Sequence, residues 1–122
     1  MKLNHDCVRD LMIYFEENLD YNNDVYVNTL PSENYSKDEL VYTTEKLNEA
    51  GYIKCVCKNY VGEKTPLIIV NAITYDGHAF LDNVRDNKIW SKTKGILSSL
   101  KSASIEIVSE TAAKVISNTI NS

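Results

Sequence analysis

The stretch YSKDELVYTTEKLNEAGYI, residues 35–53, decides the fold because it carries its own start and stop signals for a helix. Ser36 is followed three residues later by Glu39, the spacing of a capping box, in which the serine oxygen accepts from a free backbone N–H of the first turn. Gly51 can adopt the left-handed conformation that ends a helix. The helical spacing predicts a buried face made of Leu40, Thr43, Thr44, Leu47 and Ala50.

Two segments with strand character follow this glycine. The first, IKCVCKNY (residues 53–60), alternates, which places Ile53, Cys55 and Cys57 on one face. The second, PLIIVNAI (residues 66–73), is apolar over residues 67–70 and should be the more buried strand. Gly62, in the intervening VGEKT, marks a hairpin tip. A capped helix, a glycine stop and a hairpin occur in this order in winged-helix domains.

The segments before the capped helix complete an abbreviated version of that arrangement. A first helix is expected from Asn4 or Asp6 to Asn18, followed by a strand from Val25 to Leu30 that pairs with the hairpin. Only one turn, residues 32–35, fits where a helix-turn-helix has a complete helix. The fold class is therefore α+β, an abbreviated winged helix-turn-helix with a two- to three-stranded antiparallel sheet.

Helical patterns fill the rest of the chain. Thr74 is expected to cap a helix with Phe80, Leu81 and Val84 inward, and Gly77 implies close approach to a neighbouring strand. A helical pattern continues over residues 89–100, and a last helix covers residues 105–120. We predict a winged-helix domain over residues 1–101. Residues 102–122 form a C-terminal helix that packs on this domain or makes a homodimer.

Length and composition favour one cytoplasmic domain. The chain has 122 residues. No apolar run approaches the ~20 residues that span a bilayer, and its N-terminus is charged where a signal peptide is apolar. Three cysteines, Cys7, Cys55 and Cys57, are an odd number that argues against a disulfide framework. We expect them to be small buried hydrophobes, and we expect no metal and no cofactor.

The charges divide the chain into an acidic and a basic part. Residues 1–51 carry four basic and eleven acidic side chains, whereas residues 52–101 carry eight basic and four acidic ones. If double-stranded DNA is bound, lysines of the hairpin and of residues 88–92 should contact its phosphates, because Glu45 and Glu49 of the capped helix repel them. The candidate nucleic-acid-binding residues are Lys54, Lys58, Tyr60, Lys64, Lys88, Lys92, Lys37 and Lys46.

A protein-interaction module is the alternative function. An acidic helix face repels DNA but suits a basic groove on a host or phage protein. The candidate interaction residues are Tyr42, Glu45 and Glu49 on the capped helix, and Val108, Ala112 and Val115 on the last helix.

Catalytic chemistry has little support in the sequence. His78 lies between Asp76 and Asp82, and Asp82, one turn away, could fix its tautomer. No nucleophile or phosphate-binding loop accompanies this pair, so we interpret His78 as structural and the chain as non-enzymatic. Arg85 and Asp86, with Asp82, are typical of a salt-bridge network near helix ends. Trp90 fits the core, with an exposed interface anchor as the alternative.

The run TYDGHAFLDNVRDNKIWSKTK, residues 74–94, resembles the signature of a family of small uncharacterised winged-helix proteins of Gram-positive phages and prophages. The resemblance covers residues 6–115 and is carried by Thr74, Gly77, His78, Phe80, Leu81, Asp82, Arg85, Asp86, Trp90 and Lys92. More loosely, the chain is similar to YjcQ-like winged-helix proteins through Glu49, Gly51, Tyr52 and Ile53 and the Trp-Ser-Lys of residues 90–92. This resemblance implies a fold and a phage setting, with no catalytic residues.

Overall fold

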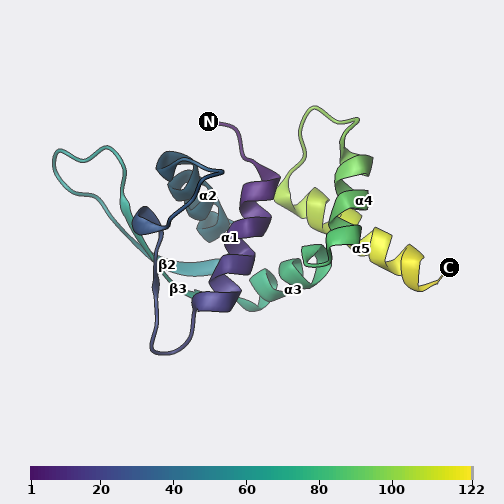
Figure 1. Cartoon of the computed structure of the whole chain (residues 1–122), viewed down its shortest axis with the longest axis horizontal. Coiled ribbons are helices and arrows are strands. Elements are labelled where there is room, and N and C mark those ends of the chain that lie inside the picture. Colours follow the sequence, from purple (N-terminus) through teal and green to yellow (C-terminus); the bar gives the residue numbers. More distant parts are fainter. Residues whose placement is uncertain (122) are drawn as a thin grey trace. The chain divides into compact units, whose positions relative to one another are not determined.

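The computed structural model describes residues 1–121, and the chain has an α+β fold (Figure 1). Its elements are α1 (His5–Asn18), β1 (Val25–Tyr26), the 3-10 helix η1 (Val27–Thr29), α2 (Lys37–Glu49), β2 (Ile53–Lys58), β3 (Leu67–Ile73), α3 (Tyr75–Val84), α4 (Asn87–Leu97) and α5 (Ile105–Ile120). They form two compact units, one of residues 1–78 and one that starts at residue 79. Within the second unit α5 packs against α4. The domain boundary expected after residue 101 stays a prediction.

The capping signals set the ends of the first two long helices. Asn4 begins α1, and its side-chain oxygen accepts from the backbone N–H groups of Asp6 (3.0 Å) and Cys7 (3.3 Å). Ser36 begins α2, and its hydroxyl oxygen accepts from the backbone N–H of Glu39 at 3.1 Å. Both predicted helix starts are confirmed.

Gly51 ends α2 in the way the sequence predicts. Its φ is +81°, in the region that side chains disfavour. Its N–H donates to the carbonyl of Asn48, and the N–H of Tyr52 donates to that of Leu47, the two hydrogen bonds of a Schellman motif. The predicted buried face is correct at four positions and wrong at Ala50, which is exposed because it is the C-terminal capping residue. Val41 is buried in addition.

The first strand is shorter than predicted. Only Val25 and Tyr26 pair with β3, and the chain then turns into η1, so the expected strand up to Leu30 is wrong. The side chain of Asn28 makes hydrogen bonds in place of the backbone hydrogen bonds of a longer strand. Its amide nitrogen donates to the carbonyl of Pro66, and its amide oxygen accepts from the N–H of Ile68, both at 2.9 Å. A side chain thus satisfies backbone groups that a longer strand would have paired.

The three strands form an antiparallel sheet in the order β1-β3-β2. The predicted hairpin is confirmed, with Lys58 opposite Leu67 and Ile53 opposite Ile73. One irregularity separates the pairs Lys54–Ala72 and Cys55–Val70, so that Asn71 is skipped. Central strand β3 is the more buried, as predicted, with Ile68 and Val70 fully covered. β2 is an edge strand.

Gly77 brings the start of α3 against the backbone of Tyr52, in the segment that joins α2 to β2. A Cβ on this residue would fall onto the carbonyl oxygen of Tyr52 and lie 2.7 Å from Cγ2 of Ile73. Thr74 caps α3, because its hydroxyl oxygen accepts from the N–H of Gly77 at 3.1 Å, and the same hydroxyl donates to the carbonyl of Gly51. The close approach predicted for Gly77 is therefore confirmed.

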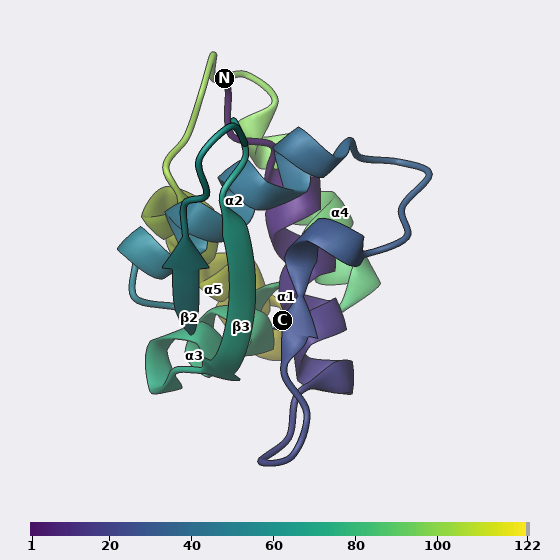
Figure 2. The ribbon, with the colours of Figure 1, turned by 90° about the vertical axis from the view of Figure 1, so that its left-hand side faces the viewer.

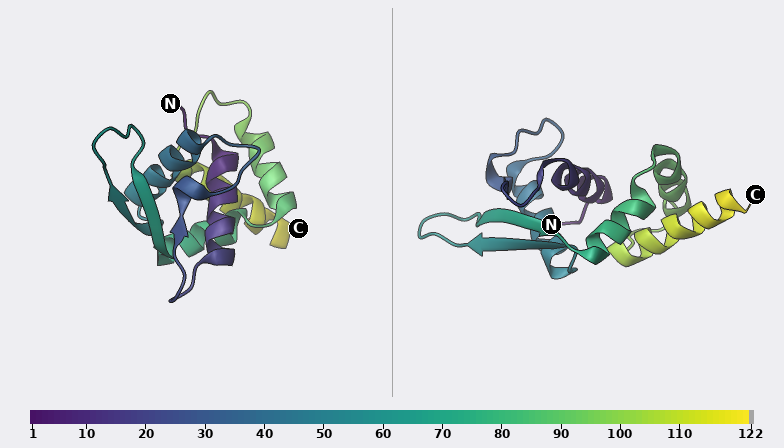
Figure 3. Two further views of the ribbon diagram at one scale, coloured as in Figure 1. Left: turned by 60° about the vertical axis from the view of Figure 1, so that its left-hand side comes forward. Right: turned by 90° about the horizontal axis from the view of Figure 1, so that it is seen from below.

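The second unit contains two helices that pack against each other, α4 and α5 (Figure 3). Asp86 caps α4 through the N–H groups of Lys88 (2.8 Å) and Ile89 (3.0 Å). Ser104 caps α5. Trp90 is only 5% exposed, in agreement with the core interpretation. In the same unit, the amide nitrogen of Asn83 donates to the hydroxyl of Ser109 at 3.0 Å.

We expect the two glycines of α3 and α4 to respond oppositely to alanine. Gly77→Ala should lower the free energy of unfolding by about 2 kcal/mol, because the new methyl group overlaps a backbone carbonyl. Gly95→Ala is the matched control. Apart from its chain neighbours and the backbone of its own helix turn, no described atom lies within 4 Å of its Cβ position. This substitution should therefore raise the free energy of unfolding by about 0.5–1 kcal/mol. Urea denaturation measures both, and equal stabilities would contradict the close approach.

Candidate nucleic-acid interface

The hairpin presents two lysines on the side of the sheet away from α2. Lys54, Val56 and Lys58 alternate along β2 and therefore share one face, opposite the face of Ile53 and Cys55. All three are exposed. β2 and β3 lie side by side with α2 behind them (Figure 2). The two lysine Cα atoms are roughly 13 Å apart, given the rise of a strand.

The loop between the strands adds one lysine and one aromatic ring. Gly62 turns the chain with a φ of +86°. Lys64 is exposed, and Tyr60 is 53% exposed. Residues 59–66 extend beyond the ends of β2 and β3 (Figures 1 and 3). Glu63 is the single carboxylate between residues 53 and 73. We call Lys54, Lys58, Tyr60 and Lys64 the hairpin cluster, which is a basic surface suited to a polyanion.

Helix α2 offers a different surface. The Nζ of Lys46 lies 2.7 Å from a carboxylate oxygen of Glu49 and 5.3 Å from the centre of the Tyr42 ring. The hydrogen bond to Glu49 raises the pKa of Lys46 above its usual value. Its charge is thus balanced within the helix. Three residues that we assigned to two different functions, Tyr42, Lys46 and Glu49, form one local cluster.

A hydrogen bond ties the hairpin to the start of α2. The hydroxyl of Thr65 donates to a carboxylate oxygen of Asp38 at 3.1 Å. Lys37, the neighbouring residue, is exposed. The carboxylate of Asp38 therefore lies beside the loop end of the hairpin, where it opposes the approach of a phosphate to this end of α2.

The remaining candidates lie in the second unit. Lys88 and Lys92 are exposed on α4. Three predicted interaction residues of α5 are instead inside the fold, because Val108, Ala112 and Val115 are at most 7% exposed. They contribute to packing within the chain, so any contact made by α5 uses its other faces.

His78 does not have the expected partner. Its Nδ1 lies 3.9 Å from a carboxylate oxygen of Glu16 on α1, whereas Asp82 accepts a hydrogen bond from Arg85 at 3.1 Å. The expectation that Asp82 orients His78 is therefore wrong, because an arginine three residues away on the same helix takes up its carboxylate. The expected ion pairing near a helix end is confirmed for Asp82 and Arg85, whereas the Asp86 carboxylate caps α4.

The cysteines differ in exposure. Cys7 is fully buried, Cys55 is half-buried and Cys57 is exposed, so the expectation of three buried cysteines is wrong for Cys57. It lies near the end of β2, where the hairpin leaves the helices. Burial raises the pKa of Cys7 to about 11. Burial also raises the pKa values of Cys55 and Cys57.

Sequence reasoning missed a surface pocket of about 330 Å³ in the first unit. Its lining comes from α1, from residues 30–35 and from the start of α2, for example Tyr14, Glu33 and Tyr35. These segments are distant in sequence, and no spacing rule links them. The hydrogen bond from the hydroxyl of Tyr35 to the carboxylate of Asp10, 25 positions away, could not be predicted from the sequence.

Residues 1–121 were also compared with the requirements of a membrane-spanning helix and of a metal site. No helix there combines the length and the apolar character that crossing a membrane requires. No three histidine, cysteine, aspartate or glutamate side chains come close enough together to hold a metal ion.

Alkylation should separate the three thiols. With iodoacetamide at pH 8 we expect Cys57 to react first, Cys55 more slowly and Cys7 only after unfolding, because burial limits access and thiolate formation. Peptide mapping by mass spectrometry gives the order. Modification of Cys7 in the folded protein at the rate of Cys57 would contradict the packing of α1.

Comparison with known proteins gives a family and one relative. The chain is 25% identical over 120 residues to an uncharacterized protein of Haemophilus influenzae (strain ATCC 51907 / DSM 11121 / KW20 / Rd), and the match covers 98% of this chain and 95% of that protein. No solved structure matches the chain. The family model described as "Hypothetical protein (DUF2513)" matches residues 2–104. Because that match spans most of the sequence, the chain belongs to the DUF2513 family.

Proposed function

We propose that this protein is a winged-helix protein that binds double-stranded DNA through the hairpin cluster, as a non-enzymatic regulator. The order of elements in the first unit supports the winged-helix assignment: α1, a short strand, η1, the capped helix α2 and the hairpin β2–β3. In this assignment η1 takes the place of the second helix of a helix-turn-helix, and β2–β3 is the wing. The phage or prophage setting and the cytoplasmic location stay predictions.

The observation that carries the proposal is the exposed basic face of the hairpin. Lys54 and Lys58 point away from the helices, and Lys64 lies in the projecting loop. α2 is less suited to reading bases, since Asp38, Glu45 and Glu49 are on it. A grip by the wing on phosphates gives affinity with little sequence preference, because phosphate contacts carry no base information.

Salt dependence provides a quantitative expectation. Each lysine that contacts a phosphate releases a counterion, so three contacts give a slope of log K against log [salt] of about −2.7. Affinity for a duplex should then fall about 40-fold between 50 and 200 mM salt.

Charge reversal tests which lysines bind. The triple variant Lys54→Glu, Lys58→Glu, Lys64→Glu should weaken binding to a fluorescein-labelled random duplex at 50 mM salt at least about tenfold, and should flatten the salt slope by about 1 for each lysine. The matched control, Lys2→Glu, Lys101→Glu, Lys114→Glu, changes the net charge equally on exposed residues elsewhere. Equal losses in the two variants, or no binding by the wild type, would refute the proposal.

A second pair tests α4. Lys88→Glu with Lys92→Glu should weaken binding if the predicted contacts of these lysines form, and its effect is compared with that of Lys101→Glu with Lys114→Glu. A loss larger than in this control assigns α4 to the interface, and an equal loss removes Lys88 and Lys92 from it.

The second candidate function is protein binding through α2. Its support is the carboxylates of Glu45 and Glu49 beside Tyr42, a surface that repels phosphate but complements a basic partner. A stoichiometric partner captured from host lysate should be lost on Glu45→Lys with Glu49→Lys and kept on Glu106→Lys with Glu110→Lys, which reverses two exposed carboxylates of α5. Retention by both variants would contradict a role for this face.

A further inference from the structure

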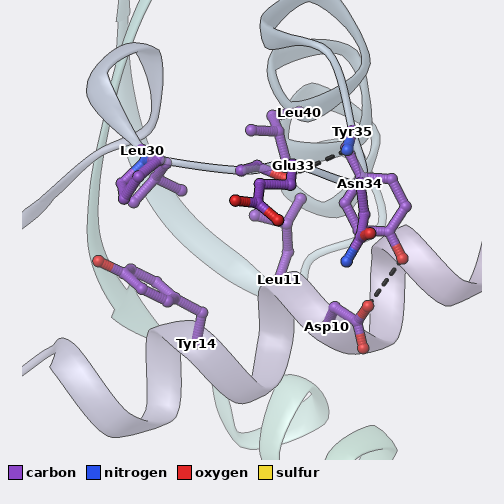
Figure 4. A pocket seen from close by; sticks show the side chains of 10 residues that line it. Asp10, Leu11, Tyr14, Leu30, Glu33, Asn34, Tyr35 and Leu40 are labelled. Atoms are coloured by element: carbon purple, nitrogen blue, oxygen red, sulfur yellow. Dashed lines mark hydrogen bonds between the residues drawn. The ribbon is translucent and has the colours of Figure 1, made fainter.

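The pocket of the first unit combines an apolar floor with a polar rim (Figure 4). Leu11 of α1 and Leu40 of α2 form its floor and are 3% and 4% exposed. Its volume of about 330 Å³ is at the lower end of the range for ligand sites. It therefore suits one long side chain rather than a large organic molecule.

A hydrogen bond fixes one side of the rim. The hydroxyl of Tyr35 donates to a carboxylate oxygen of Asp10 at 2.7 Å, which leaves the other oxygen of that carboxylate available as an acceptor. The backbone N–H of Tyr35 donates to the hydroxyl of Ser32 at 3.1 Å, which steadies residues 32–35. Burial and the neighbouring Asp10 raise the pKa of Tyr35, so its hydroxyl stays a donor at neutral pH.

The other rim groups are Glu33 and Tyr14. In Figure 4 the carboxylate of Glu33 lies over Leu11, between the ring of Tyr14 and the Tyr35–Asp10 pair. Glu33 is exposed, and Tyr14 is 36% exposed. Of the described residues, those that line the pocket include two carboxylates and no basic side chain. The pocket thus has negative charge at its mouth and aliphatic carbon at its floor.

We propose that this pocket receives an arginine side chain of a partner protein. The methylene groups of arginine would contact Leu11 and Leu40, and the guanidinium would reach the carboxylates of Asp10 and Glu33. A planar guanidinium matches a carboxylate in two-point hydrogen bonding and stacks on a tyrosine ring, which a lysine ammonium does less well. Residues 1–51, which contain all the residues that line the pocket, carry eleven acidic and four basic side chains, and this excess of negative charge attracts a basic protein.

This site is independent of the proposed DNA interface. Its residues lie on α1, on the segment before α2 and at Leu40, whereas the hairpin cluster lies on residues 54–64. A duplex is a polyanion and is repelled by Asp10 and Glu33. Failure of one proposal therefore leaves the other standing, and each has its own variants.

Titration of the ¹⁵N-labelled protein with N-acetyl-arginine amide tests the pocket. We expect saturable shifts of the backbone amides of residues 10–14 and 32–35, and a weaker response to N-acetyl-lysine amide. Glu33→Gln should raise the dissociation constant about tenfold, since it removes a charged hydrogen-bond acceptor. Tyr35→Phe should raise it about fivefold, because it frees the Asp10 carboxylate from its orienting hydroxyl.

Glu63→Gln is the matched control, since it removes the same charge from an exposed glutamate of the hairpin loop. It should leave the dissociation constant unchanged. The spectrum of each variant without ligand shows that the fold is retained. Shifts that do not saturate, that occur outside the pocket, or that persist equally in Glu33→Gln would overturn the proposal.

Discussion

The first unit depends on how its hairpin closes at the backbone of Gly51 and Tyr52. The carbonyl of Tyr52 accepts from the N–H of Thr74, and the carbonyl of Gly51 accepts from the Thr74 hydroxyl. Gly77 lets α3 start against the same peptide groups. The end of α2, the start of β2, the end of β3 and the first turn of α3 therefore meet at one point. This junction determines the position at which the hairpin starts relative to α2.

Opposite charges lie on two elements that this junction joins. The hairpin presents lysines on its free face, whereas carboxylates dominate α2, and the Thr65–Asp38 hydrogen bond holds them together at the other end of the hairpin. The ion pair of Lys46 with Glu49 strengthens the contrast, because it neutralises one of the two lysines of α2 within the helix. A polyanion and a polycation would thus meet different faces of the same small unit.

Local sequence signals predicted much of this fold, and the features that they missed depend on contacts between residues distant in the sequence. Ser36 and Gly51 determine where a helix starts and ends through hydrogen bonds to near neighbours, so the sequence was sufficient there. Asn28 was missed because its amide bonds to backbone groups about forty residues away, which shortens β1. The hairpin lysines followed from alternation, but the pocket beside Tyr35 arises from three segments that only folding brings together.

The strand order also gives Lys54 and Lys58 a second role. Within residues 1–121, β2 has a neighbouring strand on one side only, so backbone N–H and C=O groups along its outer side can pair with a strand of another molecule. Two positive charges on a six-residue strand oppose such self-association by repulsion between like copies. Solubility at high concentration therefore constrains these positions even where no ligand is bound, and a neutral apolar residue at either one would favour aggregation.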